Sequence, residues 1–214
     1  MKKTLLAVAL AAAVAPSFAN AEAGDVVVRL RATQVSPDTN SDLGKYLGSP
    51  GANLKVDDNT IPEIDFSYYV TKNIATELIL AVGSRHTVNA HLATGTKDLG
   101  KVNLLPPTLL AQWHFNPDQK FDPYLGAGVS YVYSLDKKLD LDGAPIKISQ
   151  DTWGAALQAG VDYNLENKWL LNFDVKKIWF NTTVRGNLDG SGYKKIDSLD
   201  IDPWVVSVGF GKKF

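Results

Sequence analysis

The histidines are the first residues to consider for chemistry, because an imidazole can act as a general base or as a metal ligand. The chain has three of them, His86, His91 and His114, and it has no cysteine. His86 and His91 lack the i, i+4 spacing and the glutamate partner of a helical zinc site. His114 with Asp174 or Glu77 could imitate an acid–base pair, but no Gly-x-Ser-x-Gly elbow or other nucleophile motif accompanies it. We therefore expect no catalytic site, no metal site, no cofactor and no enzymatic activity.

A second group of polar residues is charged and occupies every second position of segments that are otherwise apolar. Alternation with period two is typical of strands whose two faces meet different media. The charged face therefore lies on one side of a sheet and the apolar face on the other. The members of this group are Arg29, Arg31, Glu63, Asp65, Glu77, His114, Asp162, Asp174 and Lys176.

Eight segments of the 214-residue chain show this alternation. The last of them ends the chain on Phe214 and carries Phe210, Val208, Val206 and Trp204 on the same face. The connections between segments are alternately long and short, as in transmembrane barrels with short periplasmic turns and long extracellular loops. The sequence thus predicts an all-β, eight-stranded antiparallel transmembrane β-barrel. The eight predicted strands cover residues 26–35, 61–70, 74–83, 104–115, 121–133, 152–163, 169–180 and 203–214.

The N-terminus predicts export. Lys2 and Lys3 precede a short apolar run from Thr4 to Val14, and Ala19-Asn20-Ala21 is a small-x-small cleavage site. This pattern is typical of a secretory signal peptide. We expect residues 1–21 to be removed, residues 22–214 to form the barrel, and the protein to lie in the cell outer membrane. The net charge of −1 gives no basic field that would favour nucleic acid.

Several blocks of this sequence resemble the OmpW family of outer-membrane proteins. They are Asn73–Leu78, Leu104–Trp113 (LLPPTLLAQW), Pro123–Gly128, Trp153–Tyr163 (WGAALQAGVDY) and Asp202–Trp204. The resemblance covers the chain after the signal peptide. It implies an eight-stranded outer-membrane barrel that passes small hydrophobic molecules.

The inward face and the loops predict a barrel with two parts, a polar periplasmic half and an apolar extracellular funnel. An eight-stranded barrel is only wide enough for side chains to fill it. Because unpaired buried charges cost several kcal/mol each, the nine charged residues are expected to form a salt-bridged network that plugs the periplasmic half. The long loops are unusually apolar, and exposed apolar surface often marks a binding site. We expect an apolar extracellular funnel above the plug, from which a hydrophobic solute leaves sideways into the lipid.

Five residues are predicted to mark this path: Leu54, Leu105, Pro106, Pro107 and Trp153. Neither proline can donate a ladder hydrogen bond, so the wall could open there, or the prolines could form a simple bulge. Strict alternation would instead turn Trp153 toward lipid as an interfacial anchor.

The expected partners are outer-membrane lipid and a small hydrophobic solute. The alternative function is a non-conducting barrel whose loops serve as a receptor or adhesion surface, for example for phage or colicins.

Overall fold

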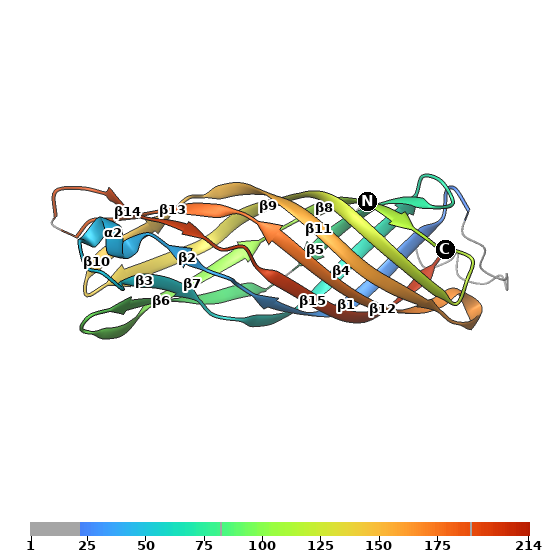
Figure 1. The fold of residues 1–214 in the computed structure, drawn as a ribbon, viewed down its shortest axis with the longest axis horizontal. Coiled ribbons are helices and arrows are strands. Elements are labelled where there is room, and N and C mark those ends of the chain that lie inside the picture. Colours follow the sequence, from blue (N-terminus) through green and yellow to red (C-terminus); the bar gives the residue numbers. More distant parts are fainter. Residues whose placement is uncertain (1–21, 82, 189) are drawn as a thin grey trace, which may run out of the picture.

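The computed structural model describes residues 22–81, 83–188 and 190–214 (Figure 1). The predicted signal peptide, residues 1–21, lies outside the described residues. Across the described ranges, no helix has both the length and the apolar character that a membrane crossing would need.

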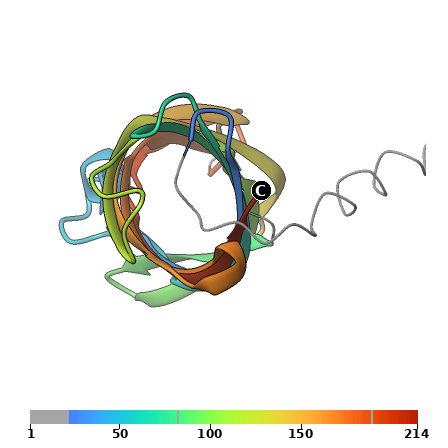
Figure 2. The same ribbon diagram turned by 90° about the vertical axis from the view of Figure 1, so that its right-hand side faces the viewer.

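Eight long strands close into an antiparallel barrel, and the end-on view shows the closed ring (Figure 2). Each strand pairs with the next one along the barrel, β9 pairs with both β8 and β11, and β1 pairs with β15 to close the ring. The predicted eight-stranded architecture is thereby confirmed. The barrel strands are β1 (Val26–Ser36), β4 (Asn59–Tyr69), β5 (Ile74–Ala81), β8 (Thr108–His114), β9 (Phe121–Leu141), β11 (Asp151–Asn164), β12 (Trp169–Trp179) and β15 (Trp204–Lys213).

Both faces of each barrel strand follow the alternation of the sequence. In β8, for example, buried and exposed residues alternate without a break. The outward side chains are large and apolar, such as Leu109, Leu125 and Val208, each 54 % exposed. This apolar exterior suits lipid rather than water. Short turns and the single-turn 3-10 helix η1 (Glu166–Lys168) connect the strands at the end that holds both termini of the described chain, Glu22 and Phe214 (Figure 1).

The four long connections are more regular than expected from the sequence. The sequence predicts loops there, but the segments contain further strands that lengthen the barrel wall at the end opposite the termini (Figure 1). The physical reason is that these segments also alternate, with small or apolar residues such as Val88 and Ala90 facing inward. The added elements are β2 (Asn40–Ser41), α2 (Leu43–Leu47), β3 (Asn53–Val56), β6 (Ser84–Leu92), β7 (Gly95–Leu105), β10 (Ala144–Ile148), β13 (Asn181–Gly186) and β14 (Lys194–Asp200).

Candidate functional site

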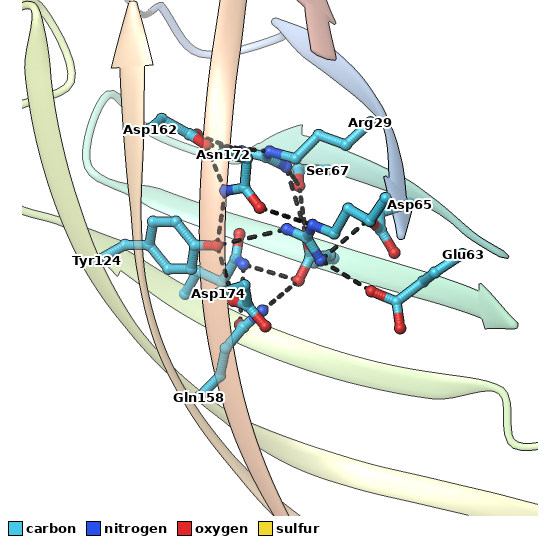
Figure 3. A network of polar contacts seen from close by, with 12 residues as sticks. Arg29, Glu63, Asp65, Ser67, Tyr124, Gln158, Asp162, Asn172 and Asp174 are labelled. Carbon is cyan, nitrogen blue, oxygen red and sulfur yellow. Dashed lines mark hydrogen bonds and ion pairs between the residues drawn. The ribbon is translucent and has the colours of Figure 1, made fainter. Parts of the chain in front are cut away.

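The lumen of the barrel contains a dense polar network (Figure 3). It lies toward the short turns, since its member His114 ends β8 and its member Asp162 lies two residues before the end of β11. All nine charged residues predicted to face inward are buried, and hydrogen bonds and ion pairs connect them into one network. Because they lie on six different barrel strands, the network crosses the lumen and fills it. We call this set of residues, with the polar side chains bonded to it, the plug.

Arg29 is one centre of the plug. Its Nη2 and Nε donate to the two carboxylate oxygens of Asp162 at 2.5 and 3.3 Å. Its Nη1 donates to the Ser67 hydroxyl at 2.6 Å and lies 3.3 Å from Glu77 Oε1. A guanidinium suits this role because its five N–H donors form a rigid fork.

Arg31, two residues along β1, is the second centre. Its Nη1 contacts Glu63 at 3.2 Å and Asp65 at 2.9 Å, and its Nη2 contacts Glu77 at 3.2 Å. Lys176 completes this part of the plug, with ion pairs to Glu63 at 3.0 Å and to Asp174 at 2.9 Å. Each cation therefore contacts at least two acidic or neutral acceptors. This is the condition under which buried charges are tolerated.

Neutral residues that the sequence analysis did not assign to the network complete it. Gln112 and Gln158 both donate to Glu77 Oε2, at 2.8 and 2.7 Å. The hydroxyl of Tyr124 donates to Asp174 at 2.8 Å and accepts from the Asn172 amide at 3.0 Å. The signal that could have found them is their position: Gln112, Gln158 and Asn172 lie on the same face of their strands as one of the nine charged residues. Tyr124 lies on the same face of β9 as the buried Asp122.

Close packing holds Tyr124 in place. A Cβ atom at Gly160 would lie 2.4 Å from the Tyr124 ring and hydroxyl. Glycine at this position therefore leaves the space that the aromatic ring fills.

His114, Asp122 and Asp162 are the one group of the described residues with metal-binding spacing, because one ligand atom from each lies within 4.8 Å of the others. In this structure His114 Nδ1 lies 2.7 Å from Asp122, and Asp162 is engaged by Arg29. These atoms already have protein partners, and they act as part of the plug.

Above the plug the interior becomes apolar and forms a cavity. Glu63 and Lys176 form its floor, so the ion pair of the plug is also the bottom of the cavity. Its walls are mainly aliphatic, and the upper part coincides with a cluster of buried residues from the extracellular strands. The residues of this upper wall include Leu54, Val88, Leu99, Val102, Leu139, Ile146, Val184 and Leu199.

His86 is the one histidine of the described residues that lines the cavity. It lies on β6, in the extension beyond the barrel, and only 3 % of its surface is exposed. Its Nδ1 lies 2.8 Å from the Asp57 carbonyl oxygen and its Nε2 lies 2.9 Å from the Ser84 hydroxyl. Burial lowers the pKa of His86, although the Asp57 carbonyl and nearby carboxylates oppose this. The neutral imidazole therefore preserves the apolar character of the wall.

The wall beside the cavity has a break in its hydrogen-bond ladder. Among the described residues, pairing between β5 and β8 ends at Thr108, and pairing between β6 and β7 begins at Leu104. Pro106 and Pro107 occupy the interval and have no N–H to donate. On their other side the prolines remain hydrogen-bonded to β9, because the Tyr131 N–H donates to the Pro107 carbonyl at 2.9 Å.

The predicted path residues divide into two groups. Leu54 and Pro106 line the cavity, whereas Leu105, Pro107 and Trp153 are not among its lining residues. The prediction that Trp153 faces the path is wrong, because its side chain is 65 % exposed on the outer face. Strand alternation places it there, at the level of the outer aromatic residues, where it packs 4.8 Å from the Tyr131 ring.

Comparison with known proteins agrees with this architecture. The family model described as "OmpW family" matches residues 22–214. Outer membrane protein W of Escherichia coli (strain K12) is 37 % identical over 220 residues and both chains are covered completely. The crystal structure of OprG from Pseudomonas aeruginosa superposes with a TM-score of 0.78 at 30 % identity, covering 90 % of this chain and 97 % of that one. A dibenzothiophene metabolism operon protein, PahQ of Pseudomonas aeruginosa, is 24 % identical over 203 residues, which are 91 % of this chain and 90 % of the relative. The chain therefore belongs to the OmpW family of outer-membrane β-barrel proteins.

Proposed function

We propose that this barrel passes small hydrophobic molecules from the cell exterior into the outer membrane. The observation that supports it most is the apolar cavity, which lies directly above a lumen closed by buried ion pairs. An apolar molecule gains free energy when it leaves water for such a cavity, at about 25 cal/mol per Å² of buried apolar surface. The cavity would thus act as an entry site.

The plug determines the direction of exit. To pass straight down the lumen, a solute would have to separate Lys176 from Glu63 and Arg31 from its acidic partners. Separating a buried ion pair costs about 3–5 kcal/mol for each partner left unpaired. An apolar solute has no charged group that could replace the broken ion pairs, so we propose that the solute does not follow this route.

The break at Pro106 and Pro107 supplies the alternative route. The cavity reaches Pro106 from inside, and neighbouring Leu105 pairs with Tyr133, whose ring is exposed among the outer aromatic residues. A solute that crosses the wall here would enter the lipid just below the outer interface. The proposal of lateral exit therefore requires no movement of the plug.

The name of one relative supports the chemical class of solute. PahQ is named for an operon of dibenzothiophene metabolism, and dibenzothiophene is a flat, apolar molecule. We extend to this chain only the class, a small molecule with little polar surface.

Uptake of an apolar fluorescent probe into vesicles that contain the purified barrel tests the proposal. Leu54→Asp places a charge in the cavity wall and should reduce the protein-dependent uptake rate several-fold. Leu47→Asp is the matched control, because Leu47 lies on the same connection but is 37 % exposed, and it should leave the rate unchanged. Equal rates for Leu54→Asp, Leu105→Asp and the unchanged protein would contradict the path and favour a receptor role for the loops.

A further inference from the structure

Three cations stand side by side on the outer face of the extracellular sheet. Lys147 on β10 is the register partner of Arg185 on β13, and Arg185 is the partner of Lys195 on β14. All three are exposed, while their strand neighbours Ile146 and Val184 are buried. Like charges directly opposite one another destabilise a sheet. This arrangement, here called the basic row, therefore gains stability from any anion that binds across it.

The basic row lacks an acidic partner within the part of the chain that the structure describes. Among the described side chains, no ion pair joins Lys147, Arg185 or Lys195 to a carboxylate. The nearby acid of β14, Asp197, is fully buried and turns inward, where it accepts bonds from the Ser41 hydroxyl at 2.5 Å and the Asp42 N–H at 2.6 Å.

A β-bulge produces this separation of charges. The register between β13 and β14 shifts between Val184 and Arg185, so that the consecutive residues Ile196 and Asp197 are both buried. Without the bulge, strand alternation would bring one of these two residues to the outer face. The bulge directs the carboxylate into the wall and leaves Lys195 outside.

Two tyrosine rings flank the basic row. Lys147 Nζ lies 3.9 Å from the centre of the Tyr193 ring, and Lys195 Nζ lies 5.5 Å from the centre of the Tyr46 ring. These cation–π contacts hold the ammonium groups in position, and the rings remain 39 % and 44 % exposed. Cations beside accessible aromatic rings suit a ligand that has both phosphate groups and sugar rings.

We propose that the basic row binds the phosphorylated sugars of lipopolysaccharide in the surrounding outer leaflet. The location of the basic row supports lipopolysaccharide as the ligand. The strands β10, β13 and β14 lie at the end of the barrel opposite the termini (Figure 1), and the three cations are exposed on the outer side of the wall. The glycans of neighbouring lipids extend alongside this surface. Arginine can bind a phosphate with two parallel hydrogen bonds, and the two lysines add point charges. This inference does not depend on the cavity or on transport.

The test measures binding of delipidated, phosphorylated core oligosaccharide to the whole barrel in phosphatidylcholine nanodiscs. The test variant is Lys147→Gln/Arg185→Gln/Lys195→Gln. The matched control is Lys55→Gln/Arg85→Gln/Lys101→Gln, which removes the same three charges from exposed positions on β3, β6 and β7. Circular dichroism and thermal unfolding establish that both variants are folded.

We expect the test variant to bind at least about tenfold more weakly, a loss of roughly 1.4 kcal/mol, while the control variant binds like the unchanged protein. Enzymatically dephosphorylated oligosaccharide should bind as weakly as the test variant does, and affinity should fall with salt. Equal affinity of the test and control variants would overturn the proposal, because net charge alone would then explain binding. Binding of a sulfated glycan in preference to the core oligosaccharide would overturn the assignment to lipopolysaccharide.

Discussion

Arg29 and Asp162 bind each other across the lumen of the barrel. They lie on β1 and β11, which are not neighbours in the wall, and the guanidinium contacts both carboxylate oxygens at 2.5 and 3.3 Å. Both side chains are buried. This pair therefore joins two parts of the wall that β12 and β15 separate, and with the other members of the plug it makes the lower lumen a solid polar core.

Asp162→Leu should destabilise the barrel strongly. It leaves the Arg29 guanidinium buried without its bidentate partner, at a cost of about 3–5 kcal/mol. Reversible urea unfolding in lipid vesicles measures the change in the free energy of unfolding. Lys72→Gln is the control, because it breaks the exposed pair between Lys72 and Asp118, and such pairs contribute little. Similar unfolding midpoints for both variants would contradict the structural role of the plug.

Gly160→Ala tests the packing within the plug. The added methyl group would lie 2.4 Å from the Tyr124 ring, so we expect a loss of about 1–3 kcal/mol from overpacking. The same substitution in a Tyr124→Leu background should cost less, because the ring that meets the methyl group is absent. A double-mutant cycle from unfolding curves measures this coupling, and additive effects would show that the contact does not determine the cost.

His86 should make stability depend on pH. Its pKa is lower in the folded barrel than the ordinary value of 6.5. As the pH falls below that value, the unfolded chain binds a proton before the folded one does, and stability is lost until the folded pKa is also passed. From pH 7 to pH 5 the unchanged protein should therefore lose unfolding free energy relative to His86→Gln, which has no imidazole to protonate. A difference that does not vary with pH would contradict a lowered pKa.

Pro106→Thr/Pro107→Thr should slow the uptake of an apolar probe. The variant restores two N–H donors. The Pro107 carbonyl already bonds to β9, so the N–H at position 107 lies on the β9 side, and the N–H at position 106 is the one that can pair across the break with the residues near Ala81. Pro145→Thr is the control, because Pro145 is exposed on β10, away from the break. Undiminished uptake by the double variant would favour the interpretation of the prolines as a simple bulge.

Much of the fold could be predicted from the sequence because a barrel in lipid has two strictly different faces. Arg29, Glu63 and Asp174 alternate with lipid-facing apolar residues, and each is buried in the structure. A charged residue on the lipid face would be costly, so the alternation persists through most of each barrel strand. The same rule explains why Trp153 lies outside the barrel.

The extracellular part could be predicted less well. In β6 two of the four buried residues, Ser84 and His86, are polar. The bulge between Val184 and Arg185 also shifts the alternation. The register between distant segments such as β3 and β6 determines which strands continue above the membrane and which residues meet in the cavity. Local sequence does not determine that register.

Photocrosslinking with an apolar diazirine probe tests the central claim, lateral exit above a closed plug, most directly. The probe is added outside vesicles that contain the barrel, and the labelled peptides are identified by mass spectrometry. We predict adducts on cavity residues such as Leu54 and Val132 and on residues beside Pro106, and none on the plug residues Gln112 and Tyr124. Adducts on Gln112 and Tyr124, with none beside Pro106, would show that the probe passes down the lumen and would contradict lateral exit.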